Sequence, residues 1–88
     1  LHMASAKGQI EAIRALVELG AHLDAVNSRG ESALVWSLTE GHPQAGVVLL
    51  KAGADPDLES QAGYSGRKAA REYEYKEVLA VMKPAGRD

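Results

Sequence analysis

Three histidines are the side chains of this sequence best suited to bind a metal ion, and nothing near them completes a site. His22 lies alone in a polar stretch, and no carboxylate stands at ligand spacing on a helix face shared with His2 or His42. The chain has no cysteine, so thiolate-ligated metals and disulfides are excluded. The sequence therefore predicts no metal centre and no other cofactor.

Hydrolytic catalysis would need a serine nucleophile, a histidine base and an acidic residue, and all three types occur. No strand pattern is present to build the turn that exposes a nucleophilic serine. Ser32 and Ser65 precede helical patterns, where a hydroxyl is expected to cap the helix. Gly66, Arg67 and Lys68 could hold an anion at a helix start, but no further glycines surround them, which favours a solvated helix face. We therefore expect a protein that is not an enzyme.

The composition restricts the class of protein further. The 88 residues allow one small domain. Ten basic and twelve acidic residues give a net charge of -2, so no overall basic field attracts nucleic acid or an anionic membrane. No apolar run approaches the roughly 20 residues of a membrane span. The absence of cysteine is compatible with the intracellular location that we expect, in a compartment that the sequence leaves open.

A repeat of 33 residues is the main signal in the sequence. When the chain is offset against itself by 33 positions, nine of the first 33 pairs are identical, where ordinary residue frequencies would give about two or three. The identical pairs include Gly8 with Gly41 and Ser32 with Ser65. Repeats of this length indicate one supersecondary unit stacked on copies of itself.

Each unit is predicted to contain a helix, a turn, a second helix and a long loop. Ser32 is a suitable N-cap for the first helix, and Gly41 can adopt the positive φ that ends it. Pro43 suits the first position of the second helix, which Gly53 ends. The polar segment 54–64 predicts an extended turn. Because one such helix pair cannot bury both faces, neighbouring units must stack on it.

The repeated residues follow a known pattern. The segment SALVWSLTEGHPQAGVVLLKAGADPD, which starts at Ser32, resembles the ankyrin repeat, whose pattern runs T-P-L-H-x-A-x-x-x-G-H and continues to L-L-x-x-G-A-D. The segment LHMASAKGQIEAIRALVELGAHLD, at the start of the chain, resembles it too. The resemblance implies an all-α ankyrin-repeat solenoid of stacked helix pairs with projecting loops. It also implies that His2 and His42 form structural hydrogen bonds to the backbone.

We expect a single ankyrin-repeat domain over residues 1–88. It comprises a partial first repeat and its loop (1–31), a full second repeat (32–64) and an atypical C-terminal capping repeat (65–88). In the capping repeat Glu74 replaces the glycine that ends the first helix. The side chains expected to face inward are Ala69, Ala70, Val78, Leu79 and Met82. Those expected to face water are Arg67, Lys68, Glu72, Glu74 and Lys76.

In the ankyrin family the loop tips and the first helices are implied to bind another protein or peptide on the concave side. By position, the implied contact residues are Lys7, Val26, Ser28, Arg29, Glu31, Thr39, Glu40, Glu59, Gln61, Tyr64, Glu72 and Tyr73, with Ala6 and Ala62 beside them. Arg29 and Tyr64 are the predicted anchors, because arginine and tyrosine are enriched among interface hot spots. Replacing either by alanine should weaken binding with little loss of stability. Scattered exposed residues of these types are also ordinary protein surface.

Other functions stay open. The repeats could be a regulatory or targeting domain of a larger enzyme, or a segment that assembles with itself through its amino-terminal face. On that face we expect Ile10, Ile13 and Leu16 to lack a polar cover, with Leu1 beside them. Trp36 is expected between repeats, where its indole N–H needs a partner. Gly46 is expected to allow close helix packing, with Trp36 as the neighbour.

Overall fold

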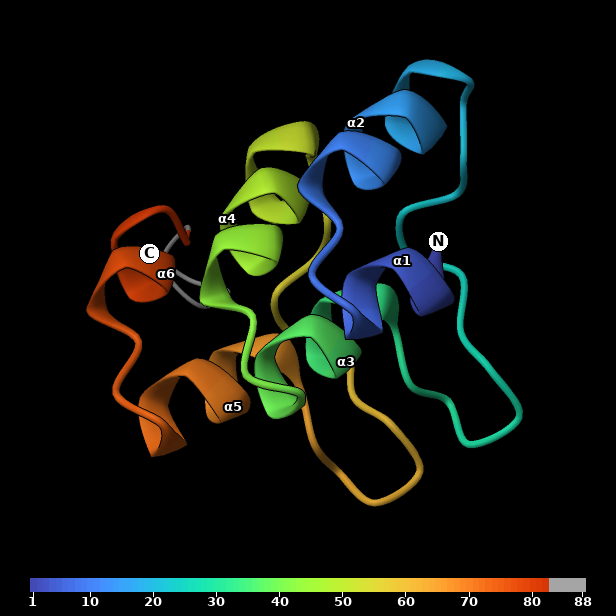
Figure 1. Cartoon of the computed structure of the whole chain (residues 1–88). Helices are drawn as coiled ribbons and strands as arrows, with labels where there is room; N and C mark the ends of the chain where they lie inside the picture. Colours follow the sequence, from blue (N-terminus) through green and yellow to red (C-terminus); the bar gives the residue numbers. More distant parts are fainter. Residues whose placement is uncertain (83–88) are drawn as a thin grey trace.

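The structure is a computed structural model that describes residues 1–82 (Figure 1). Within these residues it contains six short helices and no strand, so the expected all-α architecture is confirmed. An antiparallel bridge joins Val26 and Ser32. No helix in this part of the chain has the length and apolar character needed to cross a bilayer. The helices are α1 (His2–Ala6), α2 (Ile10–Glu18), α3 (Ala33–Thr39), α4 (Pro43–Ala52), α5 (Gly66–Glu72) and α6 (Lys76–Ala80).

The helices form three pairs, α1 with α2, α3 with α4 and α5 with α6, that stack side by side (Figure 1). We call α1, α3 and α5 the inner helices, and α2, α4 and α6 the outer helices. Each inner helix packs against the next inner helix, and each outer helix packs against the next outer helix. Two long loops project from the stack (Figure 1). We call them the first finger (residues 20–31) and the second finger (residues 53–64). The pair α5 and α6 is the capping unit.

Caps at both ends define the helices where the sequence predicted them. The Ser32 hydroxyl accepts a hydrogen bond from the backbone N–H of Val35 at 3.3 Å, and Ser65 does the same for Lys68 at 3.2 Å. These bonds satisfy N–H groups that have no partner inside the helix. Pro43 stands in the first turn of α4, and Gly53 ends this helix with a φ of 114°.

The core lies between the inner and outer helices and consists of small and aliphatic side chains. Its largest fully buried members are Ile13, Leu34, Leu38, Leu49 and Val78. Burying each leucine or isoleucine contributes roughly 1.5–3 kcal/mol. Buried alanines between them let the short helices approach closely.

Two expectations about packing were wrong. The neighbour of Gly46 is Leu38 rather than Trp36, because a Cβ at Gly46 would lie 2.6 Å from Leu38 Cδ2. Ile13 is fully buried rather than uncovered at the amino-terminal face, because α2 packs against α4 and directs this side chain into the core. The exposed large apolar residues of the first pair are instead Met3 and Leu19.

The capping unit follows the prediction except at Arg67. Ala69, Ala70 and Val78 are fully buried, while Leu79 and Met82 are half-buried against the core; Lys68, Glu72, Glu74 and Lys76 are exposed. Arg67, expected to face water, is 8% exposed. It occupies the position that Leu34 has one unit earlier, so its stem enters the core and its guanidinium reaches Asp57. Residues 83–88 of the expected capping repeat lie outside the described residues.

Candidate protein-binding surface

The tip of the first finger is a hairpin organised by Asn27. Its side-chain oxygen accepts hydrogen bonds from the backbone N–H groups of Arg29, at 2.9 Å, and Glu31, at 3.0 Å. The backbone N–H of Asn27 donates to the carbonyl of Glu31, and the backbone N–H of Gly30 donates to the carbonyl of Asn27. The tip is therefore held by the chain itself, and it presents Ser28 and Arg29 to solvent.

The second finger repeats this design 33 residues later. The N–H of Ser60 donates to the carbonyl of Tyr64 at 2.8 Å, and the N–H of Gly63 donates to the carbonyl of Ser60 at 2.9 Å. The hydroxyl of Ser60 accepts from the N–H of Tyr64, as the amide of Asn27 does from Glu31. Serine and asparagine both bond to nearby backbone, so either residue can stabilise the turn.

Hydrogen bonds between the fingers fix their relative position. The backbone N–H of Gln61 donates to the carbonyl of Arg29 at 2.9 Å, and its side-chain amide donates to the carbonyl of Ser28 at 3.0 Å. Nearer the helices, the Asp24 carboxylate accepts from the N–H of Asp55 at 2.8 Å. Gln61 was predicted only as a contact residue, and the structure shows that it also joins the fingers.

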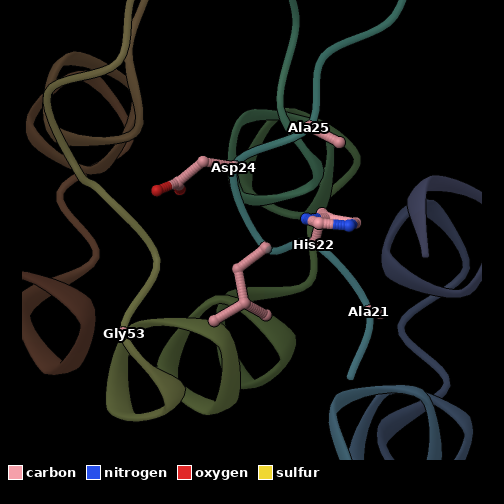
Figure 2. A pocket seen from close by; sticks show the side chains of 6 residues that line it. Ala21, His22, Asp24, Ala25 and Gly53 are labelled. Carbon is pink, nitrogen blue, oxygen red and sulfur yellow. The ribbon is translucent and has the colours of Figure 1, made fainter. Parts of the chain in front are cut away.

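A shallow hollow of about 580 Å³ lies at the base of the first finger (Figure 2). Figure 2 shows that His22 and Asp24 point to opposite sides of this loop, with Asp24 directed toward the segment that follows Gly53. The carboxylate therefore serves to join the two loops, and it does not converge with the imidazole. Within residues 1–82, no three histidine, aspartate or glutamate side chains gather where they could bind one metal ion.

Glu31 connects the first finger to the inner helices. One oxygen of its carboxylate accepts from the indole N–H of Trp36 at 2.7 Å and from the side-chain amide of Asn27 at 2.9 Å. These two hydrogen bonds lower the pKa of Glu31 below its ordinary value. The backbone carbonyl of Glu31 is 2.7 Å from Nε2 of His2, whose ring meets Trp36 edge-on at 5.6 Å. The backbone hydrogen bond implied for His2 is thus present, and the indole of Trp36 has its partner.

His42 stands at the N-cap of α4, and its ring lies against Gly8. The backbone N–H of His42 donates to the carbonyl of Ser37 at 2.8 Å, and its carbonyl accepts from the N–H of Gly46 at 3.3 Å. The hydrogen bond from the ring to the backbone that the resemblance implied for His42 is not present within residues 1–82.

Tyr64 connects the second finger to α5. It is half-buried against the core, and its hydroxyl donates a hydrogen bond to the carboxylate of Glu72. Burial and this carboxylate raise the pKa of Tyr64 well above its ordinary value, because both oppose the phenolate. Nearby, the ammonium of Lys68 lies 3.0 Å from the Glu59 carboxylate and 2.7 Å from the carbonyl of Gly63. The last turn of α5 and the second finger therefore form one continuous surface.

The contact residues predicted from the sequence fall into two groups. The exposed ones are Lys7, Val26, Ser28, Arg29, Glu40, Glu59, Gln61, Glu72 and Tyr73. Glu31, Thr39 and Tyr64 are half-buried and form hydrogen bonds within the chain. We call the surface that these twelve residues share the finger surface. Asn27 and Lys68 hold the fingers but were not among the predicted contact residues, although an asparagine three residues before a glycine is a recognisable turn signal.

Comparisons with known proteins agree with this architecture. Residues 1–50 match the family model described as ankyrin repeats in many copies. An ankyrin repeat domain from Acinetobacter baumannii has a similar structure, with a TM-score of 0.81 and 31% identity, over 89% of this chain and 42% of that one.

Two curated relatives are much longer proteins. The E3 ubiquitin-protein ligase KEG of Arabidopsis thaliana is 41% identical over 56 residues, which cover 62% of this chain and 3% of the ligase. The palmitoyltransferase Hip14 of Drosophila melanogaster is 38% identical over 66 residues, which cover 74% of this chain and 10% of that enzyme. The chain thus spans no more than a tenth of either relative. The matched family model and the stacked helix pairs show that the chain belongs to the ankyrin repeat family.

Proposed function

We propose that this chain is a protein-interaction module that binds a protein or peptide through the finger surface. The observation that carries the proposal is the fixed relation between the two fingers, which the hydrogen bonds of Gln61 to Ser28 and Arg29 maintain. A surface that is already ordered loses little conformational entropy on binding. Ankyrin repeats are generally non-catalytic interaction modules, which supports the same reading.

Arg29 and Tyr73 are the best anchors on this surface. Arg29 projects from a finger tip whose backbone is held by Asn27, and its side chain is exposed. Tyr73 is 45% exposed at the end of α5. Tyr64, the other anchor suggested by the sequence, packs against the core and bonds to Glu72, so we expect its truncation to lower stability as well as binding.

Peptide selection followed by NMR tests this proposal. Peptides selected from a random 12-residue display library against the chain should shift the amide resonances of the fingers and inner helices. Resonances of the outer helices should shift less. Arg29→Ala should weaken binding of those peptides with little change in the unfolding midpoint, while Arg14→Ala, on the outer helix α2, serves as the matched control. Shifts confined to the outer helices, or no enriched peptide, would refute the proposal.

The relatives favour a second, compatible function. The similar proteins are named as a ubiquitin ligase and a palmitoyltransferase, and the matched part is a small share of each. We therefore propose that the chain acts as a recruiting module in a larger protein whose activity resides elsewhere. Deleting these residues from that protein should reduce modification of a recruited substrate while leaving activity on a small generic substrate unchanged. Equal loss of both activities would contradict it.

A further inference from the structure

The three inner helices end in a row on the finger surface. Their C-terminal caps are Lys7 for α1, Glu40 for α3 and Tyr73 for α5, and the three residues hold the same position in successive units. All three side chains are exposed. Because α1 packs on α3 and α3 on α5, and packed helices lie about 8–10 Å apart, a cation, an anion and an aromatic ring follow one another at about that spacing.

The two charged residues of this row, Lys7 and Glu40, form no ion pair within the described part of the chain. The ion pairs found within residues 1–82 join Arg67 with Asp57 and Lys68 with Glu59. Lys7 and Glu40 take part in neither, and both face solvent. Their charges are therefore available to a partner.

Glu40 has no evident role in stability. The last carbonyls of a helix carry partial negative charge, so a cation at this end is favourable and an anion is unfavourable. Lys7 satisfies this rule at the end of α1, whereas Glu40 violates it at the end of α3. Beside Glu40, Tyr73 offers an aromatic face, and Glu72 adds a carboxylate. A cation supplied by a partner would meet favourable groups on each side, including the ring through a cation–π contact.

We propose that the finger surface recognises a polypeptide segment that presents one acidic and one basic side chain on the same face, about 10–13 Å apart. The acidic group binds Lys7, and the basic group binds between Glu40 and Tyr73. An extended segment rises about 3.3 Å per residue and points alternate side chains to opposite faces, so the two side chains would be four positions apart, about 13 Å. In a helix, which rises about 1.5 Å per residue, they would be seven apart. This proposal rests on the proposed function and adds the chemistry of the partner.

The same charges disfavour a nucleic acid at this surface. Glu40, Glu59 and Glu72 are exposed along the finger surface. Their carboxylates would repel a phosphate backbone, whose binding requires neutralisation by several cations. A polypeptide carrying both signs of charge can instead match Lys7 and Glu40 together.

The peptides selected from the random 12-residue library provide the test. We expect enriched sequences to pair an acidic with a basic residue at a spacing of four or seven. Lys7→Ala and Glu40→Ala should each weaken their binding by about fivefold, the upper range for one exposed ion pair. The double variant Lys7→Glu, Glu40→Lys should prefer peptides in which the acidic and basic residues are exchanged. Lys51→Glu, an exposed residue of the outer helix α4, should leave binding unchanged.

The outcomes separate the two proposals. Some peptides could shift the resonances of the finger surface and yet bind the parent chain and the charge-exchanged double variant equally well. That result would overturn the acid–base assignment and leave the proposed function intact. Binding that is unaffected by Arg29→Ala, Tyr73→Ala and the charge exchange would overturn both proposals, and so would a failure to enrich any sequence. Circular dichroism spectra of all variants should match that of the parent chain, because the changed side chains are exposed.

Discussion

The guanidinium of Arg67 forms two hydrogen bonds with the carboxylate of Asp57, at 2.7 and 3.2 Å, and so attaches the second finger to the capping unit. The two partners differ in exposure. The side chain of Arg67 is 10% exposed and that of Asp57 is 45% exposed. Loss of the carboxylate would take one charged partner from a nearly buried cation, whereas loss of the guanidinium would leave an anion that water can solvate.

The first prediction uses this asymmetry. Asp57→Asn should lower the free energy of unfolding by about 1–3 kcal/mol, because the hydrogen bonds between Arg67 and this position lose their charged acceptor. Arg67→Leu, which restores the apolar residue type of Leu34, should cost less. Urea unfolding of both variants checks the order, and an Arg67→Leu variant that is the less stable of the two would contradict it.

The same pair should contribute to acid unfolding. Arg67 holds the pKa of Asp57 below its ordinary value of 3.8. A carboxylate whose pKa is lowered by folding stabilises the native state above its unfolded pKa, and this contribution is lost as the pH falls through the lowered pKa. Asp57→Asn should therefore make stability less dependent on pH below about 4.

The second prediction concerns Glu74, which has a φ of 58° at the turn between α5 and α6. Gly41 holds the equivalent position one unit earlier, with a φ of 87°. A residue with a Cβ is strained in this left-handed conformation by roughly 1 kcal/mol or more. Glu74→Gly should thus raise the thermal midpoint, whereas Glu77→Gly, inside α6, should lower it. A lower midpoint for Glu74→Gly would show that its side chain has a stabilising contact that outweighs the strain.

The sequence predicted those features that depend on local chemistry and on the repeat. The caps at Ser32 and Ser65 and the turn at Gly53 follow from residue type, so the structure confirms them. Arg67 was misplaced because its long side chain combines a buried stem with a polar end, and only the path of the chain reveals that Asp57 lies within reach. Likewise, the burial of Ile13 depends on how α2 packs against α4, which no local pattern specifies.

The third prediction concerns Ser5, whose side chain is fully buried in the first unit. Its hydroxyl is without a hydrogen-bond partner in the described structure. An unsatisfied buried hydroxyl costs about 1–3 kcal/mol, so Ser5→Ala should stabilise the fold by about 1 kcal/mol. Ser37→Ala is the matched control, because the Ser37 hydroxyl is equally buried but donates to the carbonyl of Leu34 at 2.8 Å. If both variants changed the unfolding free energy alike, the lack of a partner at Ser5 would not matter.

The fourth prediction uses Trp36, the one tryptophan of the sequence, as a reporter on Glu31. The Glu31 carboxylate accepts from the indole N–H, and its pKa lies below the ordinary 4.5 because of its hydrogen bonds with Asn27 and Trp36. The fluorescence of Trp36 should therefore change with a midpoint below pH 4.5. The stability that these hydrogen bonds contribute is fully present above the pKa that Glu31 has in the unfolded chain. It is lost as the pH falls through the lower pKa of Glu31 in the folded chain.

Glu31→Gln should remove this fluorescence transition, since the amide does not titrate. Asp57→Asn, in the second finger, should keep it. A transition above pH 4.5, or one that persists in Glu31→Gln, would assign the change to another group.

The fifth prediction separates finger packing from backbone strain. Gly30 and Gly63 occupy equivalent turns, with φ values of 75° and 79°, so alanine is strained at both. A Cβ on Gly30 would lie 3.2 Å from the backbone nitrogen of Gln61, whereas a Cβ on Gly63 would meet nothing within 4 Å. Gly63→Ala should cost about 1 kcal/mol from strain alone, and Gly30→Ala should cost more because it also pushes the fingers apart. Only Gly30→Ala should accelerate hydrogen exchange at the Gln61 amide, which donates to Arg29. Equal costs and unchanged exchange would mean that the fingers are positioned by their helices rather than by each other.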